Sequence, residues 1–136
     1  MKKVDVVGAV ITNEKGEILC AKRSQQMSLP GMWEFPGGKM EPGETPEESL
    51  AREIREELGC EIQVGALISD DVYEYPTVAV RLITYYAKVI SGTPVAKEHE
   101  RLEWVSEADL MKLEWAPADV PTVKKLISKA EIEKAE

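Results

Sequence analysis

The stretch from Thr45 to Gly59 constrains this chain most, because it carries the signals for the start, the body and the end of one helix. Thr45 is a favourable N-cap, Pro46 suits the first helical position, and Glu48 stands where a capping box needs its carboxylate. Gly59 supplies the left-handed residue that commonly ends a helix. These residues predict a helix that begins at Pro46 and ends just before Gly59.

The predicted helix has an apolar stripe with an acidic stripe beside it. At roughly 100° per residue, the apolar stripe consists of Leu50, Ala51, Ile54 and Leu58. Glu53, Glu56 and Glu57 form the acidic stripe, and like charges at this spacing destabilise a helix by a few tenths of a kcal/mol per pair, to within about twofold. Hard cations such as Mg²⁺ bind a few carboxylates together with substrate phosphates, so a metal would relieve this repulsion. A solvated acidic face is the alternative interpretation.

The spacing of fixed residues from position 38 to position 60 carries a resemblance to a known family. Gly38 is followed after five residues by Glu44, and after seven more by Arg52-Glu53-Ile54-Arg55-Glu56-Glu57-Leu58-Gly59-Cys60. This pattern resembles the complete signature of the Nudix hydrolases; Cys60 alone departs mildly, since a larger aliphatic residue is usual there. The resemblance implies an α/β class fold, the Nudix α/β/α sandwich with a mixed β-sheet and a central loop–helix catalytic motif.

Composition limits the class of partner. The chain has 136 residues, and we expect one domain over residues 1–136 with the Nudix box at 38–60. A net charge of −8 argues against a nucleic-acid polymer or an anionic membrane as the main partner, but not against a small nucleotide. Cys20 and Cys60 lack metal-type spacing and favour reduced thiols. We expect a cytoplasmic protein; the oligomeric state, monomer or homodimer, stays open.

The remaining elements follow from β-branched runs and turn residues. Val4–Thr12 and Glu17–Lys22 flank a turn and predict a hairpin, and residues 24–32 form a polar loop suited to a mobile flap. Strands are predicted at residues 61–75, 78–90 and 101–105. An amphipathic helix is expected at the C-terminal end, with Leu126, Ile127 and Ala130 on its apolar face.

The resemblance implies the residues of a metal site. Glu56 and Glu57 are the main expected ligands, helped by Glu98 and by the Gly37 carbonyl, for Mg²⁺ with Mn²⁺ as a possible substitute. Glu53 is expected to orient and deprotonate the attacking water while also touching the metal cluster.

The loop that supplies Glu98 leaves an alternative open. By position Glu98 matches the family's further glutamate better than Glu100 does. His99, between them, is expected to be a solvated loop residue and not a catalyst.

Substrate contacts are implied at five further positions: Arg23, Glu34, Phe35, Lys39 and Asp119. The alternative for Arg23 is a surface charge, and the alternative for Lys39 is a solvated loop lysine. Glu34 and Phe35 belong to the strand that lines the nucleoside pocket in the family.

Asp119 precedes a helix, and the alternative to substrate contact there is an ordinary N-cap. Its surroundings resemble the segment in which MutT-type enzymes contact the base, and the Asp version resembles the bacterial CTP pyrophosphohydrolases. Glu44 and Arg52 are expected to pair and fix the loop on the helix.

The resemblance implies a Mg²⁺-dependent nucleoside triphosphate pyrophosphohydrolase that releases a monophosphate and pyrophosphate. The expected substrates are 8-oxo-dGTP, or CTP, dCTP and their modified forms. ADP-ribose and dinucleoside polyphosphates are the alternative substrates within the family. A non-catalytic module that senses a nucleotide is the alternative from another class, but it predicts a damaged box, whereas the box here is intact.

Overall fold

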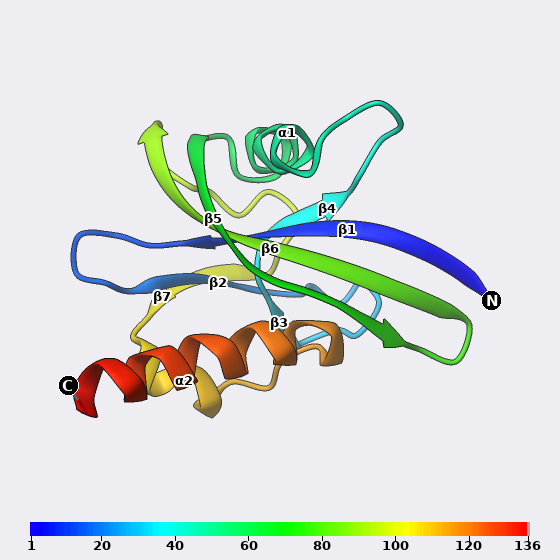
Figure 1. Ribbon diagram of the computed structural model, residues 1–136. Helices are drawn as coiled ribbons and strands as arrows, with labels where there is room; N and C mark the ends of the chain where they lie inside the picture. The colour runs from blue at the N-terminus through cyan, green and yellow to red at the C-terminus, as the bar shows by residue number, and fades with distance from the viewer. Residues whose placement is uncertain (136) are drawn as a thin grey trace.

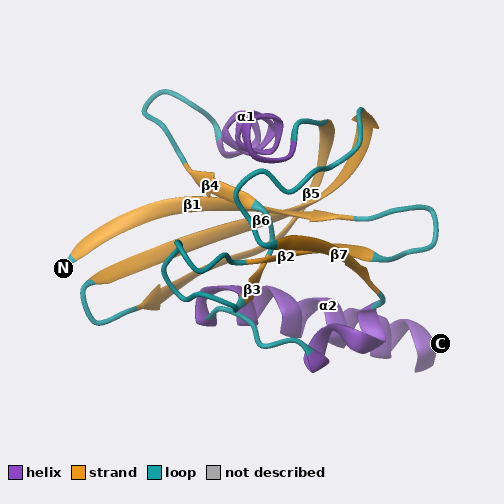
Figure 2. Cartoon of the chain, turned by 180° about the vertical axis from the view of Figure 1, so that it is seen from behind, coloured by secondary structure: helices purple, strands orange, loops and turns teal. Residues whose placement is uncertain are grey.

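The computed structural model describes residues 1–135. Figure 1 shows α1 on one side of the strands and α2 on the other, and Figure 2 shows the same layers from behind. This α/β/α arrangement confirms the fold class implied by the resemblance. In chain order the elements are β1 (Lys2–Ile11), β2 (Ile18–Lys22), β3 (Trp33–Glu34), β4 (Gly37–Lys39), α1 (Pro46–Leu58), β5 (Glu61–Glu74), β6 (Val78–Ser91), β7 (Arg101–Val105), the 3₁₀ helices η1 (Glu107–Lys112) and η2 (Pro117–Asp119), and α2 (Val120–Ala135).

The strands form two sheets. The larger sheet has the order β4-β1-β6-β5, in which β1 and β6 are parallel and the other pairs antiparallel, so it is mixed as expected. The smaller sheet has the order β3-β2-β7 and is antiparallel. The predictions of strands at 61–75, 78–90 and 101–105 are confirmed to within one residue at each end.

The predicted hairpin of Val4–Thr12 with Glu17–Lys22 is wrong. Among the described residues, the backbone pairing of the two segments is limited to the turn, where Asn13 bonds Glu17 and Thr12 forms a bridge with Ile18, and β1 then enters the larger sheet while β2 enters the smaller one. Residues 7–11 and 18–21 are all buried, so each strand is covered on both faces. Strands buried on both faces belong inside layered sheets and not in an isolated two-stranded ribbon.

Two apolar cores hold the layers together. The first lies between α1 and the larger sheet and includes Leu50, Ile54 and Leu58 of the predicted apolar stripe. The second lies toward α2 and includes Phe35 and Leu126. Because α1 packs through its apolar stripe, the acidic stripe beside it stays at the edge of the packed layer. Within residues 1–135, the helices are too short or too polar to cross a lipid bilayer.

Candidate active site

Helix α1 forms as its end signals predict. Thr45 and Glu48 make a capping box in which each side chain bonds the other residue's backbone N–H. Pro46 occupies the first helical position, and Gly59 ends the helix at φ = 70°, a left-handed conformation that favours glycine. These ends fix which residues of α1 face the strand β4.

Two glycines of β4 allow close approaches on different sides of the strand. A Cβ atom on Gly38 would lie 2.2 Å from Oε2 of Glu53 in α1, and one on Gly37 would lie 1.9 Å from the carbonyl oxygen of Val7 in β1. Neither position accepts a side chain without rearrangement. Gly38 therefore lets the Glu53 carboxylate lie against the β4 backbone, where the sequence predicts the metal site, while Gly37 lets β4 pack closely on β1.

Arg52 organises the carboxylates around it. Its Nε and Nη2 donate to the two oxygens of Glu44 at 2.7 and 2.9 Å, and Nη2 also donates to the Lys39 carbonyl at 3.2 Å. Its Nη1 donates to Glu53 at 2.9 Å and to Glu56 at 3.2 Å. The expected Glu44–Arg52 pair is confirmed. The bonds from Arg52, together with smaller contributions from Ser49 and the Glu41 backbone, lower the pKa of the Glu44 carboxyl to about 2.

Glu57 differs from its two acidic neighbours on α1. Its Oε2 is buried and has no hydrogen-bond partner within the described chain. The pKa of Glu57 is raised to about 7, chiefly by burial and further by the charges of Glu53, Glu34 and Glu98, while His99 acts in the opposite direction. A buried oxygen without a partner among other carboxylates is costly, and a cation would satisfy it.

The carboxylate oxygens of the acidic stripe are suitable ligands for a hard divalent cation, but in this structure they are not arranged as a ready set of ligands. Within residues 1–135, no three acidic, histidine or cysteine side chains form a ready set of metal ligands. Glu53 and Glu56 are instead held by Arg52. Their oxygens, together with the unpaired oxygen of Glu57, are the ligand type that Mg²⁺ and Mn²⁺ prefer. We call Gly37, Gly38, Glu53, Glu56 and Glu57 the acidic end of the site.

The loop before β7 separates the two candidate glutamates. Glu98 is exposed and raises the pKa of Glu57, so its charge acts on the acidic end. Glu100 pairs with Lys22 of β2 at 3.2 Å. This arrangement favours Glu98, as the sequence did, over Glu100.

A cleft of about 750 Å³ connects the acidic end to an aromatic wall. Of the predicted site residues, the cleft is lined by Arg23, Glu34, Phe35, Gly37, Lys39, Glu57 and Asp119. Met27, Ser28 and Leu29 of the predicted flap also line it. The other predicted residues (Glu53, Glu56 and Glu98) are not among the described lining residues, so Glu57 is the acidic-stripe residue that reaches the cleft.

Asp119 does not act as the N-cap that the sequence allowed. It lies in η2, is 6% exposed, and its Oδ1 accepts a hydrogen bond from the backbone N–H of Phe35 at 3.0 Å. Burial is the main cause that raises its pKa well above the usual range, followed by the charge of Glu34. This favours the protonated acid, which carries one O–H donor besides its acceptors.

The segment before Asp119 is fixed by contacts with β3 and with the end of β5. Trp33 donates from its backbone N–H to the Glu114 carbonyl and accepts from the Ala116 N–H, while the rings of Phe35 and Trp115 lie 4.7 Å apart. The hydroxyl of Tyr75 accepts a hydrogen bond from the Ala118 N–H at 3.1 Å. We call Phe35, Tyr75 and Asp119 the aromatic end of the site.

Sequence reasoning missed Tyr75 and misjudged His99. Tyr75 lines the cleft, and its place beside the turn at Pro76 was the available signal. His99 was expected to be solvated, and this is wrong: it is 6% exposed, and its Nε2 lies 2.7 Å from Oε2 of Glu34. The prediction failed because the burial of His99 depends on the pairing of β7 with β2, which the local sequence does not display.

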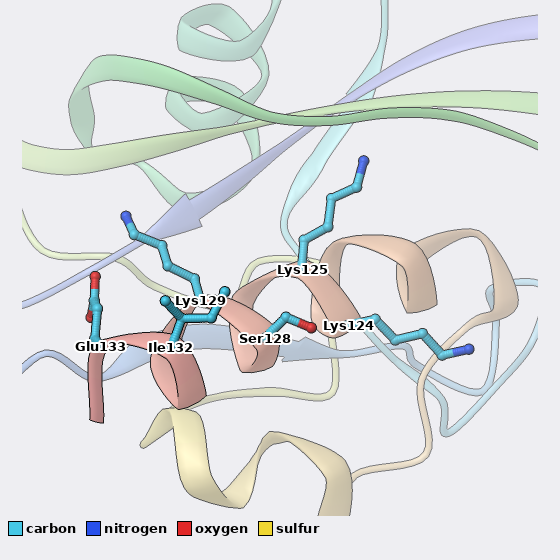
Figure 3. Close-up of a pocket in the computed structure, with 6 residues that line it drawn as sticks. All are labelled: Lys124, Lys125, Ser128, Lys129, Ile132 and Glu133. Carbon is cyan, nitrogen blue, oxygen red and sulfur yellow. The ribbon is translucent and has the colours of Figure 1, made fainter. Parts of the chain in front are cut away.

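A second, open hollow runs along α2, away from this cleft. Figure 3 shows its lining, and Lys125 and Lys129 point toward the sheet. Lys125 binds Ser69 and Asp71, and Lys129 lies over the ring of Tyr86 at 5.0 Å. These lysines are engaged with the protein's own side chains, so the hollow offers no chemistry comparable to that of the cleft.

Comparison with known proteins agrees with this geometry. The model of the NUDIX domain matches residues 2–126. The CTP pyrophosphohydrolase of Escherichia coli K12 is 39% identical over 124 residues, covering 91% of each chain. The 8-oxo-dGTP diphosphatase of the same organism is 36% identical over 126 residues, covering 93% of this chain and 98% of its own. A solution structure of the Nudix hydrolase MutT from methicillin-resistant Staphylococcus aureus 252 has a TM-score of 0.76 and 48% identity, covering 95% of this chain and 99% of its own.

The chain belongs to the Nudix family, and it is a Nudix hydrolase. Nudix hydrolases generally use divalent metal ions, which agrees with the oxygen-rich acidic end. Its similar relatives are named as diphosphatases of two different nucleotides, a purine and a pyrimidine. The family is therefore established, whereas the base is a separate question.

Proposed function

We propose that this protein is a Mg²⁺-dependent nucleoside triphosphate pyrophosphohydrolase of the MutT type, acting in the cytoplasm on 8-oxo-dGTP or on CTP, dCTP and their modified forms. The observation that carries the proposal is one cleft with the unpaired Glu57 oxygen at its acidic end and the buried Asp119 at its aromatic end. A nucleotide has the same division, with phosphates that need a cation and a base that needs a flat apolar wall.

In this proposal Glu56, Glu57, Glu98 and the Gly37 carbonyl would hold the cation, and Glu53 would also contact it. A bound Mg²⁺ supplies charge neutralisation at the phosphate oxygens and lowers the pKa of water. Glu53 orients the attacking water and accepts its proton. Proton transfer to a general base of this kind accelerates a reaction by about 10²–10⁴-fold. Arg52 keeps Glu53 in place through the bond at 2.9 Å.

The resemblance to MutT-type enzymes implies that water attacks the β-phosphorus. The water oxygen bonds to the β-phosphorus while the bond from that phosphorus to the α–β bridging oxygen breaks. The products are a nucleoside monophosphate, which keeps the bridging oxygen, and pyrophosphate. Arg23 and Lys39 are cationic residues of the cleft wall and would contact the substrate there.

The aromatic end would select the base. Phe35 and Asp119 both line the cleft there, and the Asp119 carboxyl offers acceptors and, when protonated, one donor. The Asp at this position resembles that of CTP pyrophosphohydrolases, and the relative with that name has 39% identity against 36% for the 8-oxo-dGTP diphosphatase. A difference of this size does not favour one base.

The test is pyrophosphate release with Mg²⁺ across a panel of nucleotides: 8-oxo-dGTP, dGTP, CTP, dCTP, 5-methyl-dCTP, ADP-ribose and a dinucleoside polyphosphate. Glu53→Gln serves as the inactive control. Preference for 8-oxo-dGTP would identify a nucleotide-pool sanitiser, and preference for cytidine nucleotides would support the interpretation of Asp119. Cleavage of ADP-ribose or the dinucleotide with no triphosphate cleaved would refute the proposed substrate class.

A further inference from the structure

A series of hydrogen-bonded polar side chains includes Arg23 and Glu34, which line the cleft, and the buried His99, which is not among the described lining residues. Nη1 of Arg23 donates to Oε1 of Glu34 at 2.5 Å, and Nε2 of His99 lies 2.7 Å from Oε2 of the same carboxylate. On its other side, Arg23 donates to the carbonyl and the hydroxyl of Ser28 in the flap, at 2.5 and 2.9 Å. The series therefore links the flap, β3 and the loop before β7.

His99 is the buried end of this series. The side chain of His99 is 1% exposed, while those of Arg23 and Glu34 are 16% and 18% exposed. The backbone N–H of the next residue, Glu100, donates to the Lys22 carbonyl at 2.9 Å, which fixes the loop on β2. His99 thus approaches Glu34 from a rigid support.

Both oxygens of the Glu34 carboxylate have partners, and the bond to Glu34 occupies one of the N–H groups of Arg23. One carboxylate oxygen accepts from Arg23 and the other faces His99, so the carboxylate has a single orientation. Arg23 uses three of the five N–H groups of a guanidinium in these bonds. Within residues 1–135, one N–H on each terminal nitrogen of Arg23 has no partner, and Arg23 lines the cleft.

We propose that His99 is a positioning residue for nucleotide binding: it holds the Glu34 carboxylate, and through it aims the free N–H groups of Arg23 at the nucleotide. The inference rests on the proposed function for the identity of the ligand. It assigns His99 no contact with the reacting atoms. Because Glu34 and Arg23 bind the substrate in this arrangement, loss of the bond weakens binding more than it slows the chemical step.

The experiment compares His99→Leu, which keeps the volume but removes the ring nitrogens, with His99→Gln, whose amide can again donate to Glu34. Lys22→Gln is the matched control, since it removes the ion pair of the same loop with Glu100 and leaves the bond to Glu34. KM and kcat are measured for the best triphosphate of the panel, and the Kd of the monophosphate product is measured at equilibrium.

In His99→Leu we expect KM and the product Kd to rise about tenfold, because a buried charged group loses one partner, while kcat changes by less than about threefold. His99→Gln restores both binding constants to within about threefold of wild type, and Lys22→Gln leaves them unchanged. Unchanged binding in His99→Leu, a loss confined to kcat, or a Gln variant as impaired as the Leu variant would each overturn the proposal.

A readout without nucleotide separates this proposal from the proposed function. The ¹⁵N–¹H signal of Arg23 Nε reports its bond to the flap in the free protein. If no triphosphate is hydrolysed but this signal is lost in His99→Leu and kept in His99→Gln, the positioning of Arg23 stands and the substrate assignment falls. If the signal is the same in His99→Leu and wild type, the positioning role is refuted.

Discussion

The acidic end and the aromatic end of the cleft are built in opposite ways. The acidic end comes from one run of sequence, since β4, the following loop and α1 are consecutive. The aromatic end is assembled from three distant segments, and the bond between Phe35 and Asp119 joins residues 84 positions apart. A local pattern can specify the first end, whereas only the folded chain produces the second.

The two ends also differ in charge. At the acidic end several carboxylates surround Arg52, and the unpaired oxygen of Glu57 leaves that charge incompletely balanced. At the aromatic end one acid is buried against rings, where burial favours its neutral form. The first environment suits phosphate and metal chemistry, and the second suits recognition of a flat, polar-edged group. Reaction type and specificity are therefore separable by substitution.

The largest expected effect belongs to the acidic end. Glu57→Gln removes the charge of the half-buried carboxylate while keeping its shape, and we expect kcat to fall by about 10²–10⁴-fold, because a weakly held cation loses its stabilisation of the transition state, which is worth several kcal/mol. Pyrophosphate release measures it, and circular dichroism checks the fold. Glu47→Gln, an exposed acid in the first turn of the same helix, should keep wild-type turnover. Near wild-type turnover in Glu57→Gln would contradict the assigned role.

The next effect tests cation binding without any substrate. Mg²⁺ or Mn²⁺ at about 100 times its Kd should stabilise the folded protein by about 2.7 kcal/mol, because a ligand of the native state shifts unfolding by mass action. Thermal unfolding with and without the cation measures this, with Ca²⁺-free buffer and chelator as the baseline. Glu57→Gln should lose most of the increase in Tm. An equal increase in the variant would place the cation elsewhere.

At the aromatic end, substitution should change selectivity more than turnover. Asp119→Ala leaves the buried Phe35 N–H without its acceptor, which costs about 1–3 kcal/mol of stability and raises KM by about tenfold. Asp119→Asn keeps an acceptor for that N–H but replaces the acid O–H by an amide. We expect it to keep Tm within about 2 °C and to change the ratio of kcat/KM between 8-oxo-dGTP and CTP. An unchanged ratio would remove Asp119 from base recognition.

The contrast between an end formed by one run of sequence and an end assembled from distant segments also explains how much of the fold and the site could be predicted from the sequence. The caps of α1, the need for Gly38 and the Glu44–Arg52 pair all follow from residues within one loop and helix, and the structure contains them. The position of His99 could not be predicted, because its partner Glu34 lies 65 residues away and meets it only after β2 pairs with β7. The hairpin of β1 and β2 failed for a similar reason, since each strand found better partners in a different sheet.

The smallest expected effect is on thermal stability, and it is tested by substituting two arginines of α1. Arg52 is 17% exposed and bonds several carboxylates, whereas Arg55 is 56% exposed and pairs with Glu61 alone. Exposed pairs contribute little, so Arg55→Gln should lower Tm by less than about 2 °C, while Arg52→Gln should lower it by about 3–6 °C. Equal effects of the two substitutions would mean that the Arg52 network does not anchor the loop to the helix.

The pH dependence of the difference in Tm between wild type and Arg52→Gln tests whether Glu44 is the main partner of Arg52. Hydrogen bonds from Arg52, and to a smaller extent from Ser49 and the Glu41 backbone, lower the pKa of Glu44 from 4.5 to about 2 in the folded protein, so the folded state favours the ionised carboxylate. The stability gained is fully present above about pH 4.5 and is lost as the pH falls toward 2, because the unfolded chain binds the proton first. The gap in Tm between wild type and Arg52→Gln should therefore be constant above pH 4.5 and should narrow below it. A gap that stays constant down to pH 2 would show that the Arg52 side chain stabilises the loop through its packing and not through the ionised Glu44.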